Sequence, residues 1–172
     1  NPNLVILFLD TQKVMGNYFF QPYDLSGQQR GEWVVQSISE LTTLINKIQE
    51  NSSAKILIHN FSVPTYSPLG IIENKQEFGF HDAIKELNRK LQNQFKEDSR
   101  VYVFDYDQFC SQKGKENLFD EKMYYLADVK LAWKFLPDLC ACYLSYIKPM
   151  LGLTRKCIVL DLDNTLWGGV IG

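Results

Sequence analysis

Short, continuous runs of apolar residues alternate along the chain with stretches in which apolar residues recur every three or four positions. A run of about four to eight apolar residues, rich in β-branched and aromatic side chains, is typical of a strand buried on both faces. Recurrence every three or four positions is typical of an amphipathic helix. The runs that predict strands are residues 4–9, 55–61, 100–106 and 157–162.

Three helical patterns accompany these strands. The third has Pro137 near its predicted first turn, where the missing N–H costs little. A strand followed by a helix, repeated, predicts a parallel sheet covered by helices on both faces, and hence an α/β fold. The apolar positions are Ile38, Leu41, Ile45 and Ile48 in the first pattern, Phe80, Ile84, Leu87, Leu91 and Phe95 in the second, and Leu136, Leu139, Cys140, Tyr143, Ile147 and Met150 in the third.

Two long segments, residues 10–33 and 62–79, show no such pattern and are interpreted as irregular. Each follows the carboxyl end of a predicted strand, which is the side on which open α/β sheets bind ligands. Polar residues at the strand ends are either ligand contacts or structural caps and hydrogen-bonding partners. These residues are Asp10, His59, Asn60 and Asp105.

Two further groups have a functional and a structural interpretation. An aromatic cluster in the first irregular segment either covers an acyl or pantetheine chain or packs on the edge of the sheet. His81, which opens a helix beside Asp82, is interpreted as a surface residue. The aromatic cluster consists of Tyr18, Phe19, Phe20, Tyr23 and Trp33.

Composition narrows the class of protein. The chain has 172 residues, of which 45% are hydrophobic, and its formal net charge is -2. Eighteen Lys and Arg nearly balance twenty Asp and Glu, without the basic patch that nucleic-acid binding requires. No apolar run reaches the length of a membrane span, and no signal peptide precedes the first strand. We therefore expect a cytoplasmic protein that binds neither nucleic acid nor membrane.

The four cysteines, Cys110, Cys140, Cys142 and Cys157, lack both zinc-type spacing and the density of a disulfide scaffold. Cys140 and Cys142 are two positions apart on a predicted helix and cannot face one another. The pattern predicts reduced thiols.

The domain boundary is predicted from a change of pattern at residues 151–156. We expect one α/β domain over residues 1–150, a linker over 151–156, and the first strand and loop of a second domain over 157–172. Because Asn1 enters a strand almost at once and residue 172 follows a single strand, we expect the chain to be a piece of a longer protein.

The strongest chemical signal is "KCIVLDLDNTLWGGVIG", residues 156–172. Asp161 and Asp163 end a predicted buried strand and are two residues apart, so both carboxylates lie on one side of it. Two converging carboxylates suit Mg²⁺, which is bound by one or two carboxylates together with water and phosphate oxygens. Asp161 and Asp163 are therefore candidate metal ligands.

The same residues predict phosphoryl transfer. A carboxylate such as Asp161 can attack phosphorus, while a second acid such as Asp163 protonates the leaving oxygen and then activates water. Thr165 can hold the nucleophile by a hydrogen bond. Gly168 and Gly169 allow close approach of the backbone.

At this point the chain resembles a known family. "IVLDLDNTLWGGVIG" resembles motif I of the haloacid dehalogenase (HAD) superfamily, and "RKCIVLDLDNTLWGGVIG" resembles its FkbH-like branch. The preceding residues are similar to the N-terminal domain of FkbH-like proteins. This resemblance implies a three-layer, flavodoxin-like parallel sheet related to SGNH hydrolases, followed by the first strand of a HAD Rossmannoid domain.

The resemblance also implies an activity. FkbH-like proteins dephosphorylate 1,3-bisphosphoglycerate, a phosphorylated small molecule, and load the glyceryl group onto an acyl carrier protein. By match to the motif, Asp161 is the nucleophile and a ligand of Mg²⁺, and Asp163 is the acid/base. Cys157 is either the thiol that carries the acyl group or an inert thiol of a buried strand.

The chain also departs from both patterns. The later HAD motifs would follow Gly172, so we expect this chain by itself to be inactive. No Asp precedes either histidine by three residues, so the SGNH D-x-x-H pair is absent from residues 1–150. The SGNH serine either lies upstream of this chain or does not exist. Two interpretations stay open: part of a phosphatase and acyltransferase, or a non-catalytic module that docks a carrier protein or an intermediate of polysaccharide biosynthesis.

Overall fold

The computed structural model describes residues 2–154. It divides into two compact units, the first ending at Leu136 and the second beginning at Pro137. The predicted strand 157–162 lies outside the described residues, so the domain limits stay predictions. In residues 2–154, no helix combines the length and apolar character needed to cross a bilayer.

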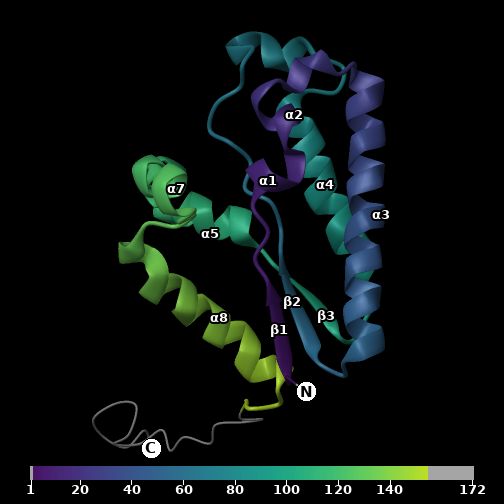
Figure 1. The fold of residues 1–172 in the computed structure, drawn as a ribbon, viewed down its shortest axis with the longest axis vertical. Helices are drawn as coiled ribbons and strands as arrows, with labels where there is room; N and C mark the ends of the chain where they lie inside the picture. The colour runs from purple at the N-terminus through teal and green to yellow at the C-terminus, as the bar shows by residue number, and fades with distance from the viewer. Residues whose placement is uncertain (1, 155–172) are drawn as a thin grey trace, which may run out of the picture. The chain divides into compact units, whose positions relative to one another are not determined.

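Three parallel strands form the sheet of the first unit, in the order β1-β2-β3 (Figure 1). They coincide with three predicted runs, but each ends two residues earlier. In the register, Leu7 lies beside Ile58, and His59 beside Phe104. The strands are β1 (Leu4–Leu7), β2 (Lys55–His59) and β3 (Val101–Phe104).

Helices occupy most of the remaining described residues. The three predicted helical patterns correspond to α3, α4 and α8. The α-helices are α1 (Thr11–Met15), α2 (Asn17–Phe20), α3 (Gly27–Asn51), α4 (Phe80–Phe95), α5 (Tyr106–Lys113), α6 (Lys115–Leu118), α7 (Glu121–Ala127) and α8 (Leu136–Met150), and the 3-10 helices are η1 (Pro22–Asp24), η2 (Gly70–Lys75) and η3 (Trp133–Phe135).

The hydrophobic core lies between the sheet and the pair α3 and α4, which run side by side along one face (Figure 1). Alternate residues of a strand point to opposite faces, so Ile56 and Ile58 of β2 point into this core. The α/β class and the parallel sheet are confirmed, whereas the three-layer detail stays a prediction. The helices contribute Val34, Leu41 and Ile45 from α3, and Phe80, Ile84, Leu87 and Leu91 from α4.

The expectation that residues 10–33 are irregular is wrong. They contain α1, α2, η1 and the first part of α3, which begins at Gly27. Ser26 and Gln29 form a capping box, in which each side chain accepts a hydrogen bond from the other's backbone N–H, at 3.2 and 2.8 Å. This pair is a helix start that depends on polar residues, so a search for apolar periodicity misses it.

The loop after β2 is held by Asn88 of α4. Its side-chain amide accepts from Phe61 N at 2.8 Å and donates to Phe61 O at 2.7 Å. One side chain thus satisfies both backbone groups of a fully buried residue. Phe61 therefore has a fixed position, from which residues 62–79 begin; this segment also includes η2.

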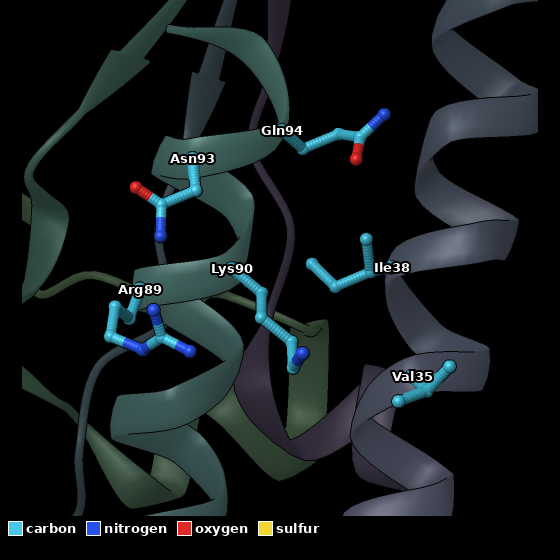
Figure 2. A pocket seen from close by; sticks show the side chains of 6 residues that line it. All are labelled: Val35, Ile38, Arg89, Lys90, Asn93 and Gln94. Carbon is cyan, nitrogen blue, oxygen red and sulfur yellow. The ribbon is translucent and has the colours of Figure 1, made fainter.

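A shallow groove separates the outer surfaces of α3 and α4 (Figure 2). Val35 and Ile38 of α3 face Lys90 and Gln94 of α4 across it, and its volume is about 290 Å³. The groove lies along the helices, whereas ligands of open α/β sheets bind at the carboxyl ends of strands. We therefore assign it no function.

Candidate functional site

A cleft of about 570 Å³ opens at the carboxyl ends of β1 and β2. Its walls come from three segments of the first unit: residues 8–12 with α2, the loop after β2, and the stretch from α5 to α7. This is the side of the sheet on which the sequence predicts ligand binding. The cleft is the candidate site.

Aromatic rings line both the floor and the rim of the cleft. Tyr106 and Phe19 are buried at its base. At the rim, Tyr66 of the second wall is 51% exposed and Tyr125 of α7 is 71% exposed. Such a lining suits an organic group with apolar surface.

Asp10 connects two walls of the cleft. Its carboxylate caps α1 by accepting from Gln12 N at 3.2 Å, and it accepts from the hydroxyl of Tyr124 at 2.9 Å. Lys130 Nζ lies 3.5 Å from the same carboxylate. Burial and the hydrogen bond to the carboxylate raise the pKa of Tyr124 well above its usual value, so this hydroxyl stays a donor. The cap predicted for Asp10 is confirmed.

A second polar network fixes the loop after β2. Asp107 accepts from Val63 N at 2.7 Å and from Lys115 Nζ at 2.6 Å, and Lys115 also donates to Val63 O at 2.7 Å. Asn60 donates to Asp105 at 2.8 Å and accepts from Asp107 N at 2.9 Å. Asn60 and Asp105 are therefore structural, and neither lines the cleft.

These networks set the charge of the cleft. Its lining contains three carboxylates, Asp10, Glu116 and Glu121, and two ammonium groups, Lys115 and Lys130. Both ammonium groups already lie within ion-pair distance of carboxylates. A phosphate would need uncommitted cations or directed N–H groups. The cleft therefore suits a neutral ligand better than an anionic one.

His59 is scaffold. Its ring is fully buried and packs between Phe8, Phe104 and Tyr106, with ring centroids 4.4 to 4.9 Å away. Burial lowers the pKa of His59 to about 3, so the ring is neutral at physiological pH. Within residues 2–154, the cleft lining contains no imidazole. A serine–histidine pair of the hydrolase type is thus absent from the lining.

His81 lies near the start of α4 and is partly buried, and its Nε2 lies 2.8 Å from Tyr66 O. Its backbone N–H donates to the buried carboxylate of Glu73 at 3.0 Å. Glu73 also accepts from the hydroxyls of Tyr23 and Ser67. Burial raises the pKa of Glu73, but these hydrogen bonds outweigh it and lower the pKa overall. The expectation of a plain surface position for His81 therefore holds only in part.

The aromatic cluster of the first irregular segment divides between the two predicted roles. Phe19 and Phe20 line the cleft, whereas Trp33 and Tyr23 pack against the core. Tyr18 is exposed. Only the two phenylalanines are placed to contact a ligand.

The predicted catalytic and metal-binding residues Asp161, Asp163, Thr165 and Cys157 lie outside the described residues, so their roles stay predictions. Within residues 2–154, no group of three or more His, Cys, Asp or Glu side chains could hold a metal ion. The cysteines among the described residues form no disulfide bonds. Burial raises the pKa of the Cys110 thiol to about 11. This thiol is inert at neutral pH.

Apolar periodicity did not indicate the whole third wall of the cleft. Helix α7, which carries Tyr124, has no such signal because it has no buried residue. The polar residues Lys115 and Lys130 have none either, whereas α5 buries Tyr106, Phe109 and Cys110 at helical spacing. Asp120, which accepts from Met123 N at 3.0 Å and so caps α7, is the sequence feature that could have indicated this helix.

The family model described as "FkbH, N-terminal domain" matches residues 1–148. No curated protein sequence matches the chain. The chain is similar to the crystal structure of the N-terminal part of BF1531 from Bacteroides fragilis, which contains a phosphatase domain complexed with Mg. The two chains share 21% sequence identity with a TM-score of 0.73, over 98% of this chain and 43% of that one. At this identity the likeness shows the fold alone.

Proposed function

This chain belongs to the family of FkbH N-terminal domains, and from this premise we propose that the whole protein is a Mg²⁺-dependent phosphatase and acyltransferase of the HAD type. Its substrate is a phosphorylated glycerate, and its acceptor is an acyl carrier protein. In this proposal the first domain is a binding module, and the chemistry belongs to the domain that begins with Asp161. The phosphatase domain and the Mg of the structural neighbour support it.

The proposed chemistry rests on two carboxylates. Asp161 attacks the ester-linked phosphate of 1,3-bisphosphoglycerate to form an aspartyl-phosphate, which leaves the acyl-phosphate of the substrate intact, and Asp163 protonates the leaving oxygen and then deprotonates the attacking water. Thr165 holds Asp161 by a hydrogen bond. Asp161 and Asp163 would hold Mg²⁺, which neutralises charge on the phosphoryl oxygens when bound. Their all-oxygen donor set fits this ion.

Acyl transfer is proposed to follow through a thiol. The thiolate of Cys157 attacks the acyl-phosphate carbon, a thioester forms, and inorganic phosphate leaves. The thiolate of the carrier's pantetheine then attacks the thioester, which moves the glyceryl group and regenerates Cys157. No oxidant or reductant is needed, because both steps exchange one acyl bond for another.

One observation carries the proposal for the first domain: its cleft combines an aromatic lining with paired charges and, among the described residues, no imidazole. A hydrolase of the SGNH type needs a base beside its serine. A neutral, partly apolar group such as the amide chain of pantetheine needs none. We therefore propose that the cleft holds the neutral arm of the carrier, while the phosphorylated substrate binds at Asp161.

The test is intact-mass spectrometry of the whole protein with Mg²⁺, freshly generated 1,3-bisphosphoglycerate and a phosphopantetheinylated carrier protein. We expect a glyceryl mass on the carrier that is lost in Asp161→Asn and kept in Asp24→Asn, which makes the same change at an exposed position. Phosphate release without a carrier adduct would leave a phosphatase with another substrate. If the wild type shows neither phosphate release nor carrier loading, only the proposal of a binding module remains.

The role of the cleft is tested separately with Tyr66→Ala. We expect carrier loading to fall at least about tenfold while Asp161-dependent phosphate release persists, because a rim aromatic contributes about 1 to 3 kcal/mol through buried apolar area. The matched control is Tyr102→Ala, at a tyrosine of β3 that does not line the cleft. Equal loss of loading in both variants would contradict docking in the cleft.

A further inference from the structure

The third wall of the cleft is a loop whose two ends meet. Ala132 N donates to Leu118 O at 2.9 Å, which closes the chain on itself on either side of α7. Leu118 and Leu131, at these two ends, are buried. Between them, α7 has no buried residue. The segment from Phe119 to Val129, here called the α7 loop, is thus anchored at its base and carries no apolar anchor in its helix.

Polar contacts connect the α7 loop to the far wall of the cleft. Tyr124 donates to Asp10 at 2.9 Å. Lys13 Nζ lies 2.5 Å from Asp128, and both side chains of this pair are more than half exposed. Exposed ion pairs contribute little to stability. The contact with the partly buried Asp10 is therefore the stronger one, because the acceptor is charged and shielded.

The other two walls are held differently. The wall formed by residues 8–12 continues directly from β1, and the loop after β2 is fixed by Asn88, Asp107 and Lys115 through hydrogen bonds to its backbone. The α7 loop has a backbone bond across its base, from Ala132 N to Leu118 O, and side-chain bonds to Asp10 and Lys13 at its tip. Of the three walls, it is the one that opens at least cost.

Apolar side chains of the α7 loop remain in solvent. Tyr125 and Leu126 are each more than 70% exposed, and Tyr125 and Phe119 line the cleft. Burial and, to a smaller extent, the nearby Tyr125 raise the pKa of Tyr66, so the two rim tyrosines lie near one another. In the view of Figure 1, α1 lies between α7 on the left and α3 on the right.

We infer that the α7 loop is a lid over the cleft, hinged at the Leu118–Ala132 backbone bond and latched in its closed position by Tyr124 and Asp10. Opening breaks the latch and leaves the hinge and the core intact. The lid controls access to the cleft whatever ligand it binds, so this inference goes beyond the proposed function and does not depend on the carrier protein.

Hydrogen exchange with mass spectrometry on the whole protein tests the motion. In Tyr124→Phe we expect exchange of the amides of residues 122–127 to accelerate roughly tenfold, since a hydrogen bond to a charged acceptor is lost. Lys13→Gln, which removes the exposed contact, should accelerate them by less. The matched control is Tyr125→Phe, which removes a hydroxyl from the same helix and keeps the latch; it should leave exchange unchanged. Unchanged amide exchange in both Tyr124→Phe and Lys13→Gln would refute the lid.

Peptide-resolved alkylation tests access to the cleft. Thr11 is buried in its wall, so we expect a thiol placed there by Thr11→Cys to react slowly with iodoacetamide and roughly tenfold faster when Tyr124→Phe is added. Exposed Cys140 and buried Cys110 provide internal references. Acceleration at position 11 with Cys110 still protected supports the lid. Equal alkylation rates at position 11 with and without Tyr124→Phe would refute the lid, because access to the cleft would not depend on the latch. Acceleration at both position 11 and Cys110 would also refute it, because it would show general unfolding.

Discussion

Single buried polar side chains decide how the loops of this protein are placed. Glu73 of η2 contacts the start of α4, where it accepts from Tyr23, Ser67 and His81 N. A Cβ at Gly79 would collide with its carboxylate, so only glycine allows this close approach. Asn88 has the same role about two turns further along α4. Both residues act by satisfying groups that would otherwise be buried without a partner.

Asn88→Ala should lower the free energy of unfolding by about 2 to 4 kcal/mol, because it leaves the N–H and C=O of buried Phe61 without their partner. Urea denaturation followed by circular dichroism measures this change. The matched control is Asn93→Ala, at an exposed asparagine of the same helix (Figure 2), which should change stability by less than about 0.5 kcal/mol. Similar effects at the two positions would contradict the role of Asn88.

Glu73→Gln should destabilise the protein by about 1 to 3 kcal/mol at pH 7, because the charged acceptor of three hydrogen bonds is replaced by a neutral one. The pKa of Glu73 is lowered on folding, so its stabilisation is present above the usual value of 4.5 and is lost as the pH falls through the folded value. The difference between wild type and Glu73→Gln should therefore shrink below pH 4.5. Urea titrations at pH 7, 5 and 3 check this trend.

The control for this pH dependence is Glu86→Gln. Glu86 pairs with Arg89 at 2.6 Å on the surface of α4, and the arginine side chain is 60% exposed. Exposed pairs contribute about 0 to 1 kcal/mol, so the pH effect should be small. A difference that stays constant from pH 7 to pH 3 for Glu73→Gln would show that the carboxylate acts only through its shape.

At the scale of elements, the start of α3 shows how local polar chemistry extends a helix beyond its apolar pattern. The apolar pattern begins at Ile38, yet α3 begins at Gly27. Ser26 is the N-cap of this helix and forms the capping box with Gln29 in its first turn. The added turns carry Arg30, whose buried guanidinium donates to Phe78 O at 2.6 Å and to Pro22 O at 3.3 Å. The helix start therefore positions the segment that follows α2 and the segment that follows η2.

Ser26→Ala should lower the free energy of unfolding by about 1 kcal/mol, because the N–H of Gln29 loses its acceptor. Ser39→Ala, at an exposed position inside α3, should be neutral or slightly stabilising, since alanine favours helices. Thermal unfolding of both variants measures the difference. Equal melting temperatures would mean that packing alone sets the start of α3.

At the scale of the whole molecule, the cleft and the predicted metal site belong to different parts of the chain. Within residues 2–154 no cluster of potential ligands could hold a metal ion, and the paired carboxylates of the motif lie beyond them. Binding of Mg²⁺ to the native state raises stability by about 2.7 kcal/mol at a hundred times its dissociation constant. We expect this gain in the whole protein.

Asp161→Asn should remove most of that gain, because it takes away one of the two predicted carboxylate ligands. Asp24→Asn, an exposed position outside the motif, should keep it. Differential scanning calorimetry with and without Mg²⁺ makes the comparison. Equal stabilisation of Asp161→Asn and wild type would place the metal elsewhere in the protein.

Apolar patterns predicted the strands and helices that form the core, and also α8, which contributes no residue to it. β1, β2, β3, α3, α4 and α8 each contain the residues whose spacing indicated them, because burial selects apolar side chains at the period of the local backbone. The sequence also pointed to the carboxyl edge of the sheet, since parallel strands bring their ends together there. The family resemblance came from contiguous motif residues and needed no fold.

Only the tertiary structure decided what lines the cleft. Tyr124 and Asp10 are 114 positions apart, and Lys115 and Val63 are 52 apart, so no local pattern could pair them. It also decided between the two interpretations of each strand-end residue: His59 is buried among aromatic rings, whereas Asp10 caps a helix and faces the cleft. Both are polar residues at strand ends. Their roles differ because aromatic neighbours distant in the chain enclose His59, whereas Asp10 keeps a position in the wall of the cleft.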